Sequence, residues 1–212
     1  MVCPMGPEFH FNLHLGDEVE ECSPDMLRQV AQSLRLDEFI PGRYAAKFVF
    51  KLHAFHRAYG VNPFQVLAEV RALEDSTHPS RTKPATEFIH PPLKGLWHKH
   101  FFTGRFIAQN LLIHHGKNGI GKIASEELPM GEICTPDMLN RLTQRLVNDA
   151  LEQRTDAGKL TGEWIVFAKH EGQNYYLSLE THLTGDDEVY RRLETMCFPQ
   201  FPFLLSTQNN GN

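Results

Sequence analysis

Alternating apolar and polar side chains mark the first element that the sequence predicts. Between residues 9 and 15 the odd positions are apolar and the even positions polar, which is typical of a half-buried β-strand. Helical spacing of apolar residues follows from Ser23 to about Leu36, from Pro41 to about Gly60, and after Asn62. The first and third of these helices begin with a capping side chain and then a proline.

Turn-forming residues divide the chain between positions 75 and 92, where prolines, serines and threonines are concentrated. We therefore predict three regions. Residues 1–85 form a mainly helical region with one strand, residues 86–204 form an α+β domain, and residues 205–212 form an irregular tail.

The second region combines helical patterns with a hairpin. Residues 93–115 have helical spacing, the glycine-rich segment 116–122 predicts a loop, and Thr135-Pro136 opens a helix expected to span 136–153. Two apolar strands, 163–170 and 174–181, predict an antiparallel hairpin on which that helix packs. The expected fold class is α+β, with a helical N-terminal part followed by helices on an antiparallel sheet.

The hairpin sequence predicts a register as well. A type II′ turn at Gly172 and Gln173 would place Trp164 and Leu179 on one apolar face. The other face would then be partly polar, which is typical either of a solvated sheet surface or of the floor of a site. Its polar members would be Lys169, Tyr176, Ser178, Glu180 and His182.

Composition limits the classes of protein to consider. The 212 residues carry a formal net charge of −5, so nucleic acid would have to bind at a local patch. The four cysteines form no C-x-x-C pair, no apolar run is long enough to span a bilayer, and the first residues do not form a signal peptide. We therefore expect a cytoplasmic protein with reduced thiols and no membrane partner.

One stretch departs from this acidic background. From Lys94 to Lys122 the chain contains cations and histidines but no Asp or Glu. Aromatic residues alternate with these cations, which favours phosphate binding next to base stacking. The alternative is an amphipathic helix with solvated cations. The nucleic-acid-binding residues expected here are Lys94, Trp97, Lys99, Arg105, Lys117 and Lys122.

Neither a metal nor a cofactor is expected. His98 and His100 do not share a helix face, and the adjacent His114 and His115 do not suit one ion. The segment Gly116–Lys122 begins like a phosphate loop, but Ile123 replaces the hydroxyl that would bind magnesium.

Three segments together resemble a known superfamily: His90–His100, Gly162–His170 and Asn174–His182. They are similar to phage- and toxin-associated nuclease domains of the barnase, EndoU and RelE-like superfamily, over about residues 88–200. The resemblance implies RNA cleavage without a metal, in which one group deprotonates the ribose 2′-OH and another protonates the leaving 5′-oxygen.

The resemblance also implies residue roles. His100 and His182 would form the acid–base pair, with His98 as a competitor of His100. Lys169 would stabilise the negative charge of the transition state. Tyr176, which the predicted register places on the same hairpin face, is a further candidate catalytic residue.

Two other functions remain open. A non-catalytic adaptor or immunity-type module would use the basic, aromatic surface to bind an acidic protein partner. A metal-dependent hydrolase would use His98, His100 and His182 as ligands.

Overall fold

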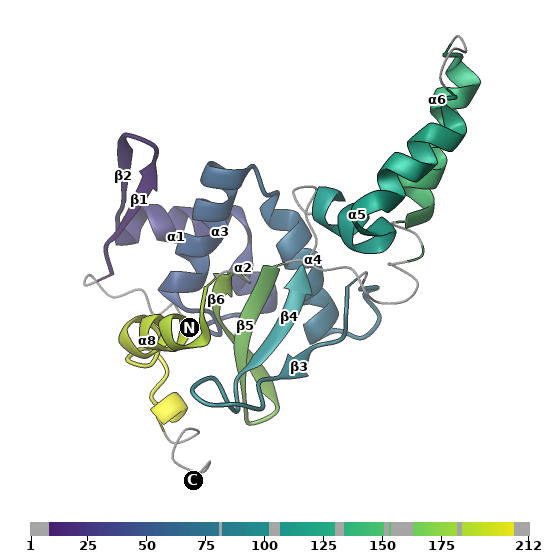
Figure 1. The fold of residues 1–212 in the computed structure, drawn as a ribbon. Coiled ribbons are helices and arrows are strands. Elements are labelled where there is room, and N and C mark those ends of the chain that lie inside the picture. Colours follow the sequence, from purple (N-terminus) through teal and green to yellow (C-terminus); the bar gives the residue numbers. More distant parts are fainter. Residues whose placement is uncertain are drawn as a thin grey trace.

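The computed structural model describes residues 9–80, 82–101, 107–129, 134–150, 153, 163–181 and 184–205. Helices and antiparallel strands are mixed along the chain, so the fold is α+β, as the sequence predicts (Figure 1). Among these described residues, every helix is too short or too polar to cross a membrane.

The N-terminal part consists of a hairpin and four helices. The predicted first strand is confirmed, but its partner was missed because the partner's sequence is Glu-Val-Glu-Glu-Cys, which lacks apolar alternation. The predicted caps are present, since Ser23 Oγ accepts the Met26 N–H and Asn62 Oδ1 accepts the Phe64 N–H. The elements are β1 (Phe11–Leu15), β2 (Glu18–Cys22), α1 (Pro24–Ser33), α2 (Leu36–Phe39), α3 (Ala46–Tyr59) and α4 (Pro63–Glu74).

A four-stranded antiparallel sheet follows in the order β3-β4-β5-β6. The prediction of a helix from residue 93 is wrong at its start, because residues 97–101 form a strand. Trp97, Lys99 and Phe101 point to one face of that strand and His98 and His100 to the other, so pairing with β5 overrides the helical spacing. The elements are β3 (Thr86–Glu87), β4 (Trp97–Phe101), β5 (Glu163–His170), β6 (Gln173–Glu180) and α8 (Asp186–Met196).

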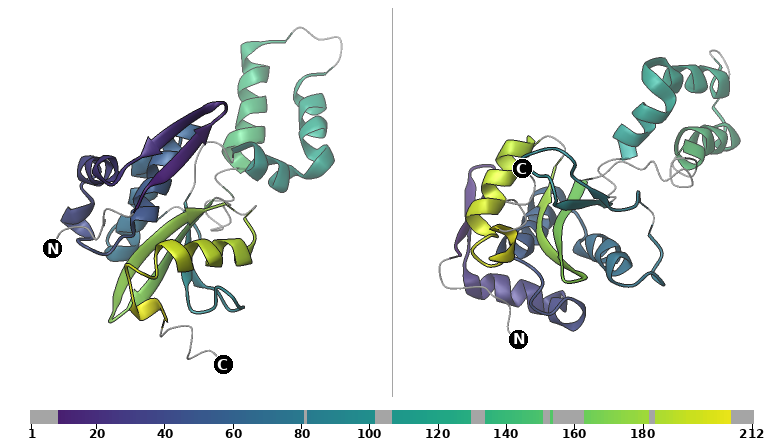
Figure 2. Two further views of the ribbon diagram at one scale, coloured as in Figure 1. Left: turned by 90° about the vertical axis from the view of Figure 1, so that its left-hand side faces the viewer. Right: turned by 90° about the horizontal axis from the view of Figure 1, so that it is seen from below.

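The sheet is buried on both faces. Ile165, Phe167 and Tyr176 pack against α1, α3 and α4, whereas Val166 and Leu177 pack under α8 and the residues after it. Figure 2 shows α8 on one side of the β5–β6 hairpin and the N-terminal helices on the other. Because the first of these cores contains residues from both sides of position 85, the helices before that position and the sheet after it fold around shared side chains.

The hairpin is confirmed, but its predicted register is wrong. The turn residues are Glu171 and Gly172, both with positive φ, which is the geometry of a type I′ turn. A β-bulge then adds a second shift: Val166 pairs with Ser178 and Phe167 with Tyr176, so that Leu177 between them has no paired residue on β5. As a result Trp164 belongs to the core under α8 and Leu179 to the core under the helices. The sequence could not reveal this, because a sheet covered on both sides has no polar face to fix its register.

The segment between β4 and β5 contains a helical arm. The arm consists of α5 (Ile107–Glu127), α6 (Pro136–Thr143) and a short π-helix at Gln144–Asn148, and it projects from the sheet (Figure 1). Two predictions are therefore wrong: residues 116–122 are helical, with a kink at Gly116, and the described helical residues 136–148 pack on the arm, not on the sheet. They pack on α5, where Glu127 binds Arg141 and Arg145.

Candidate active site

One end of the sheet gathers histidine, tryptophan and glutamate side chains. There β4 ends, β5 begins and β6 ends, so that His100 pairs with Trp164 and Trp164 pairs with Glu180. Glu163 pairs with Phe101 in the next row. We call this end of the sheet, with His98, His100, Glu163, Trp164 and Glu180 and the two α3 lysines described below, the sheet-end site.

The two histidines of β4 share one face of the sheet. Their ring centroids are 5.6 Å apart, and the His98 ring lies 5.2 Å from the indole of Trp164. His98 is half-buried, whereas His100 is 7% exposed. The sequence placed both histidines among the candidate residues, and the strand geometry brings them together beside an aromatic surface.

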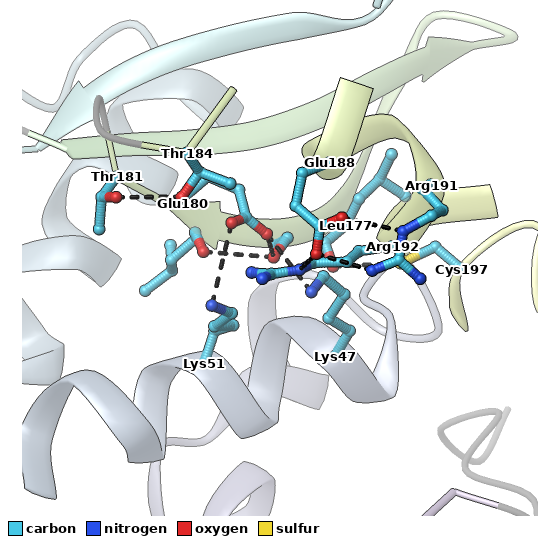
Figure 3. A network of polar contacts seen from close by, with 12 residues as sticks. Lys47, Lys51, Leu177, Glu180, Thr181, Thr184, Glu188, Arg191, Arg192 and Cys197 are labelled. Atoms are coloured by element: carbon cyan, nitrogen blue, oxygen red, sulfur yellow. Dashed lines mark hydrogen bonds and ion pairs between the residues drawn. The ribbon is translucent and has the colours of Figure 1, made fainter. Parts of the chain in front are cut away.

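A buried cluster of charges lies at the same end of the sheet, around Glu180 of β6. The Lys47 ammonium lies 3.4 Å and the Lys51 ammonium 3.9 Å from the carboxylate of Glu180, whose side chain is 0% exposed. Ser178 Oγ donates a hydrogen bond of 2.6 Å to the same carboxylate. Figure 3 shows the two lysines reaching from α3 toward Glu180, with the polar side chains of α8 beside them.

Burial sets the electrostatics of this cluster. Desolvation lowers the pKa of Lys51, and the nearby Glu180 carboxylate acts in the opposite direction. Lys47 and Lys51 are four residues apart, so α3 presents both from one side. Well-packed apolar side chains would stabilise a fold at least as well as buried ion pairs, so stability alone does not explain these charges. Ionisable groups with shifted pKa values are common at functional sites. The arrangement therefore marks this end of the sheet as a candidate active site.

Solvent reaches the lysines through a cavity of about 390 Å³ between β1, α3 and α8. Four cationic side chains line it, together with one carboxylate, Glu188, which bonds to Arg191 and Arg192. The cations are Lys47, Lys51, Arg191 and Arg192. A positively lined cavity suits an anion such as a phosphate group.

Lys169 lies elsewhere, which corrects its expected position near the histidines. Its ammonium stacks on the Trp97 ring, 3.4 Å from the ring centroid. Because Trp97 and His98 are neighbours on a strand, they point to opposite faces of the sheet. Lys169 also belongs to the end of β5 that adjoins the turn, so it cannot join the sheet-end site.

Tyr176 is a buried structural residue. Its hydroxyl donates a 2.6 Å hydrogen bond to Glu74, which also binds Arg43 and Asn174. Burial and this carboxylate raise the pKa of Tyr176 far above its usual range. The hydroxyl therefore holds α4 against β6 and faces away from the histidines.

The Glu74 network predicts a dependence of stability on pH. Although burial opposes it, hydrogen bonding to Arg43, Tyr176 and Asn174 lowers the pKa of Glu74 below its ordinary value of 4.5. Its contribution to stability is thus complete above that value and lost as the pH falls through the lower, folded-state pKa. Urea unfolding should show a larger loss of stability between pH 6 and pH 3.5 for the wild type than for Glu74→Gln. Equal losses would contradict this role.

The predicted basic surface does not form among the cations that the structure describes, Lys94, Lys99 and Lys122. Lys99 is 3% exposed, and its ammonium is 3.2 Å from Glu69 and bonded to Ser80 and Thr82. Lys94 is exposed before β4, and Lys122 is exposed on the arm, 3.9 Å from Glu126. The side chain of Lys117 lies outside the described part of the chain. One buried lysine and a lysine on a separate arm cannot form a continuous patch with Lys94.

Two predicted site residues, Arg105 and His182, also lie outside the described residues. His182 follows Glu180 by two positions along the chain, and Arg105 follows Phe101 by four. The expectation that His182 approaches His98 or His100 stays a prediction.

The lysines of α3 were missed by the sequence analysis. Their signal was a pair of cations four residues apart in the first half of α3, where the other residues from Ala46 to Leu52 are apolar. Glu180 was noticed only as part of a polar face. Its contact with α3 depends on tertiary packing, which strand alternation does not encode.

Comparison of the chain with protein-family models, with curated proteins and with solved structures finds no match.

Proposed function

We propose that this chain is an endoribonuclease that cleaves RNA without a metal ion, using the sheet-end site. The observation that carries the proposal is that His98 and His100 on β4 and the buried Lys47–Lys51–Glu180 cluster beside β6 lie at the same end of the sheet, with Trp164 of β5 between His100 and Glu180. Histidines titrate near neutral pH, and the lysines line a cavity open to an anion.

The proposed chemistry is transesterification followed by release of the product. A basic imidazole takes the proton of the ribose 2′-OH, and the 2′-oxygen attacks the adjacent phosphorus. The bond to the 5′-oxygen breaks, a protonated imidazole donates its proton to that oxygen, and a 2′,3′-cyclic phosphate remains. His100 and His182 are the proposed pair, and His98 is the alternative to His100.

Lys51 replaces Lys169 as the proposed stabilising cation. Its side chain is 18% exposed and lines the cavity, so a phosphate oxygen can approach its ammonium. Lys47 is more deeply buried and neutralises Glu180. The Glu180 carboxylate therefore competes less strongly with an incoming phosphate for the Lys51 ammonium. The half-buried Trp164 offers an aromatic surface beside the histidines for a base.

A direct test is incubation of the purified chain with labelled RNA, with and without EDTA. We expect cleavage at equal rates in both, with a bell-shaped pH profile between about pH 5 and 8. Cleavage that EDTA abolishes would favour the metal-dependent alternative. If RNA is bound but not cut, the enzyme proposal is wrong and an RNA-binding module is left. If RNA is neither bound nor cut, the module that binds a protein partner is left.

A further inference from the structure

A second group of chemically reactive side chains lies at the β1–β2 hairpin. Glu20 and Cys22, two residues apart on β2, point to the same face, and His53 of α3 lies opposite them. One ligand atom from each of the three lies within 4.8 Å of the other two. The Cys22 side chain is buried, whereas the side chains of His53 and Glu20 are 13% and 27% exposed.

The donor atoms suit one class of ion. Thiolate sulfur, imidazole nitrogen and carboxylate oxygen are the ligands of zinc, and bond lengths of about 2.0–2.3 Å place such donors roughly 3.3–3.8 Å apart in a tetrahedral site. His53 Nε2 is already 2.9 Å from Glu20 Oε1. Small rotations about side-chain bonds would therefore bring Cys22 Sγ into the same sphere.

The surroundings also fit an ion. Arg57 Nε donates a 3.1 Å hydrogen bond to Glu20 Oε2, which fixes the carboxylate and leaves Oε1 turned toward His53. A thiolate and a carboxylate together carry two negative charges, which a divalent cation neutralises. With three protein ligands, a fourth position stays open, and His53 borders a cavity of about 550 Å³ through which water or another ligand can enter.

We propose that Glu20, Cys22 and His53 form a zinc site that fastens the β1–β2 hairpin to α3. Zinc binds the Cys22 thiolate, Nε2 of the neutral His53 imidazole, which carries its proton on Nδ1, and a Glu20 oxygen, and the thiol proton passes to solvent as the ion enters. The ligands belong to the hairpin and to the middle of α3, outside the sheet-end site. This proposal does not depend on RNA cleavage, and its tests do not use that activity.

Cobalt(II) provides a spectroscopic probe of the metal-free full-length chain. We expect saturation at one equivalent, with a thiolate-to-cobalt charge-transfer band that excess zinc removes. The band should disappear in Cys22→Ser and should weaken strongly in His53→Ala. Cys134→Ser is the matched control because Cys134 is exposed and outside the cluster, so this variant should keep the full band.

Thermal unfolding gives an independent readout. Zinc at a hundred times its Kd should raise the Tm of the wild type and of Cys134→Ser, and should leave the Tm of His53→Ala nearly unchanged. The His53 side chain is partly exposed, so His53→Ala should keep the fold. This variant therefore tests the proposal even if Cys22→Ser fails to fold. A wild type without the charge-transfer band, or a band that persists in folded Cys22→Ser, would overturn the proposal.

Discussion

Replacing Lys99 with methionine is expected to lower the free energy of unfolding by about 3–5 kcal/mol, the usual effect of breaking a buried ion pair. The Lys99 ammonium donates to Ser80 Oγ at 2.7 Å, to Thr82 Oγ1 at 2.8 Å and to the Lys83 carbonyl at 2.6 Å. It therefore anchors the loop between α4 and β3 to the strand that carries His98 and His100. Urea denaturation measures the loss.

Two further variants make this test specific. Lys94→Met changes an exposed lysine of the same stretch and should alter stability by no more than about 0.5 kcal/mol. Combining Lys99→Met with Glu69→Gln should recover part of the loss, because Glu69 is then no longer a buried charge without its partner. If Lys99→Met were as mild as Lys94→Met, the structural role of Lys99 would be wrong.

Lys51→Met is expected to slow RNA cleavage by about 100-fold or more, the usual effect of removing one group that stabilises transition-state charge. The reason is that its partly exposed side chain lines the cavity, 3.9 Å from Glu180. The fold should survive, since Glu180 keeps its contacts with Lys47 and Ser178. Single-turnover cleavage rates and circular dichroism separate the loss of chemistry from a loss of structure.

Lys169→Met is the matched control for this experiment. It removes a lysine from the other end of the same sheet, on the face opposite the histidines, where the ammonium rests on Trp97. Cleavage should continue within a few-fold of the wild-type rate. A loss with Lys169→Met and none with Lys51→Met would restore the roles implied by the family resemblance and reject the corrected site.

Local patterns predicted much of the fold. Ser23-Pro24 and Asn62-Pro63 begin helices because their side chains satisfy N–H groups that a helix start leaves free. The apolar strands of the β5–β6 hairpin were equally clear. The wrong predictions concern contacts between residues far apart in the sequence. Residues 97–101 form a strand because they pair with β5, and the arm helices pack together with ion pairs between Glu127 and two arginines.

Only part of the candidate site could be predicted from the sequence, because its other contacts join residues that are far apart in the chain. His98 and His100 were visible as unusual residues in an acidic chain. Lys99, which stands between them, was assigned to RNA although it is buried against Glu69, because a charged residue in a sequence gives no sign of its burial. The roles of Lys47 and Lys51 depend on Glu180, which is more than a hundred residues away along the chain.

We propose that the sheet-end site uses the 2′-OH of RNA as the nucleophile. The most direct measurement compares one RNA oligonucleotide with its fully 2′-O-methylated counterpart, both in EDTA, and identifies the product ends by mass spectrometry. We predict cleavage of the unmodified strand alone, with a 2′,3′-cyclic phosphate on the upstream product. No cleavage of either strand, or equal cleavage of both, would contradict the account.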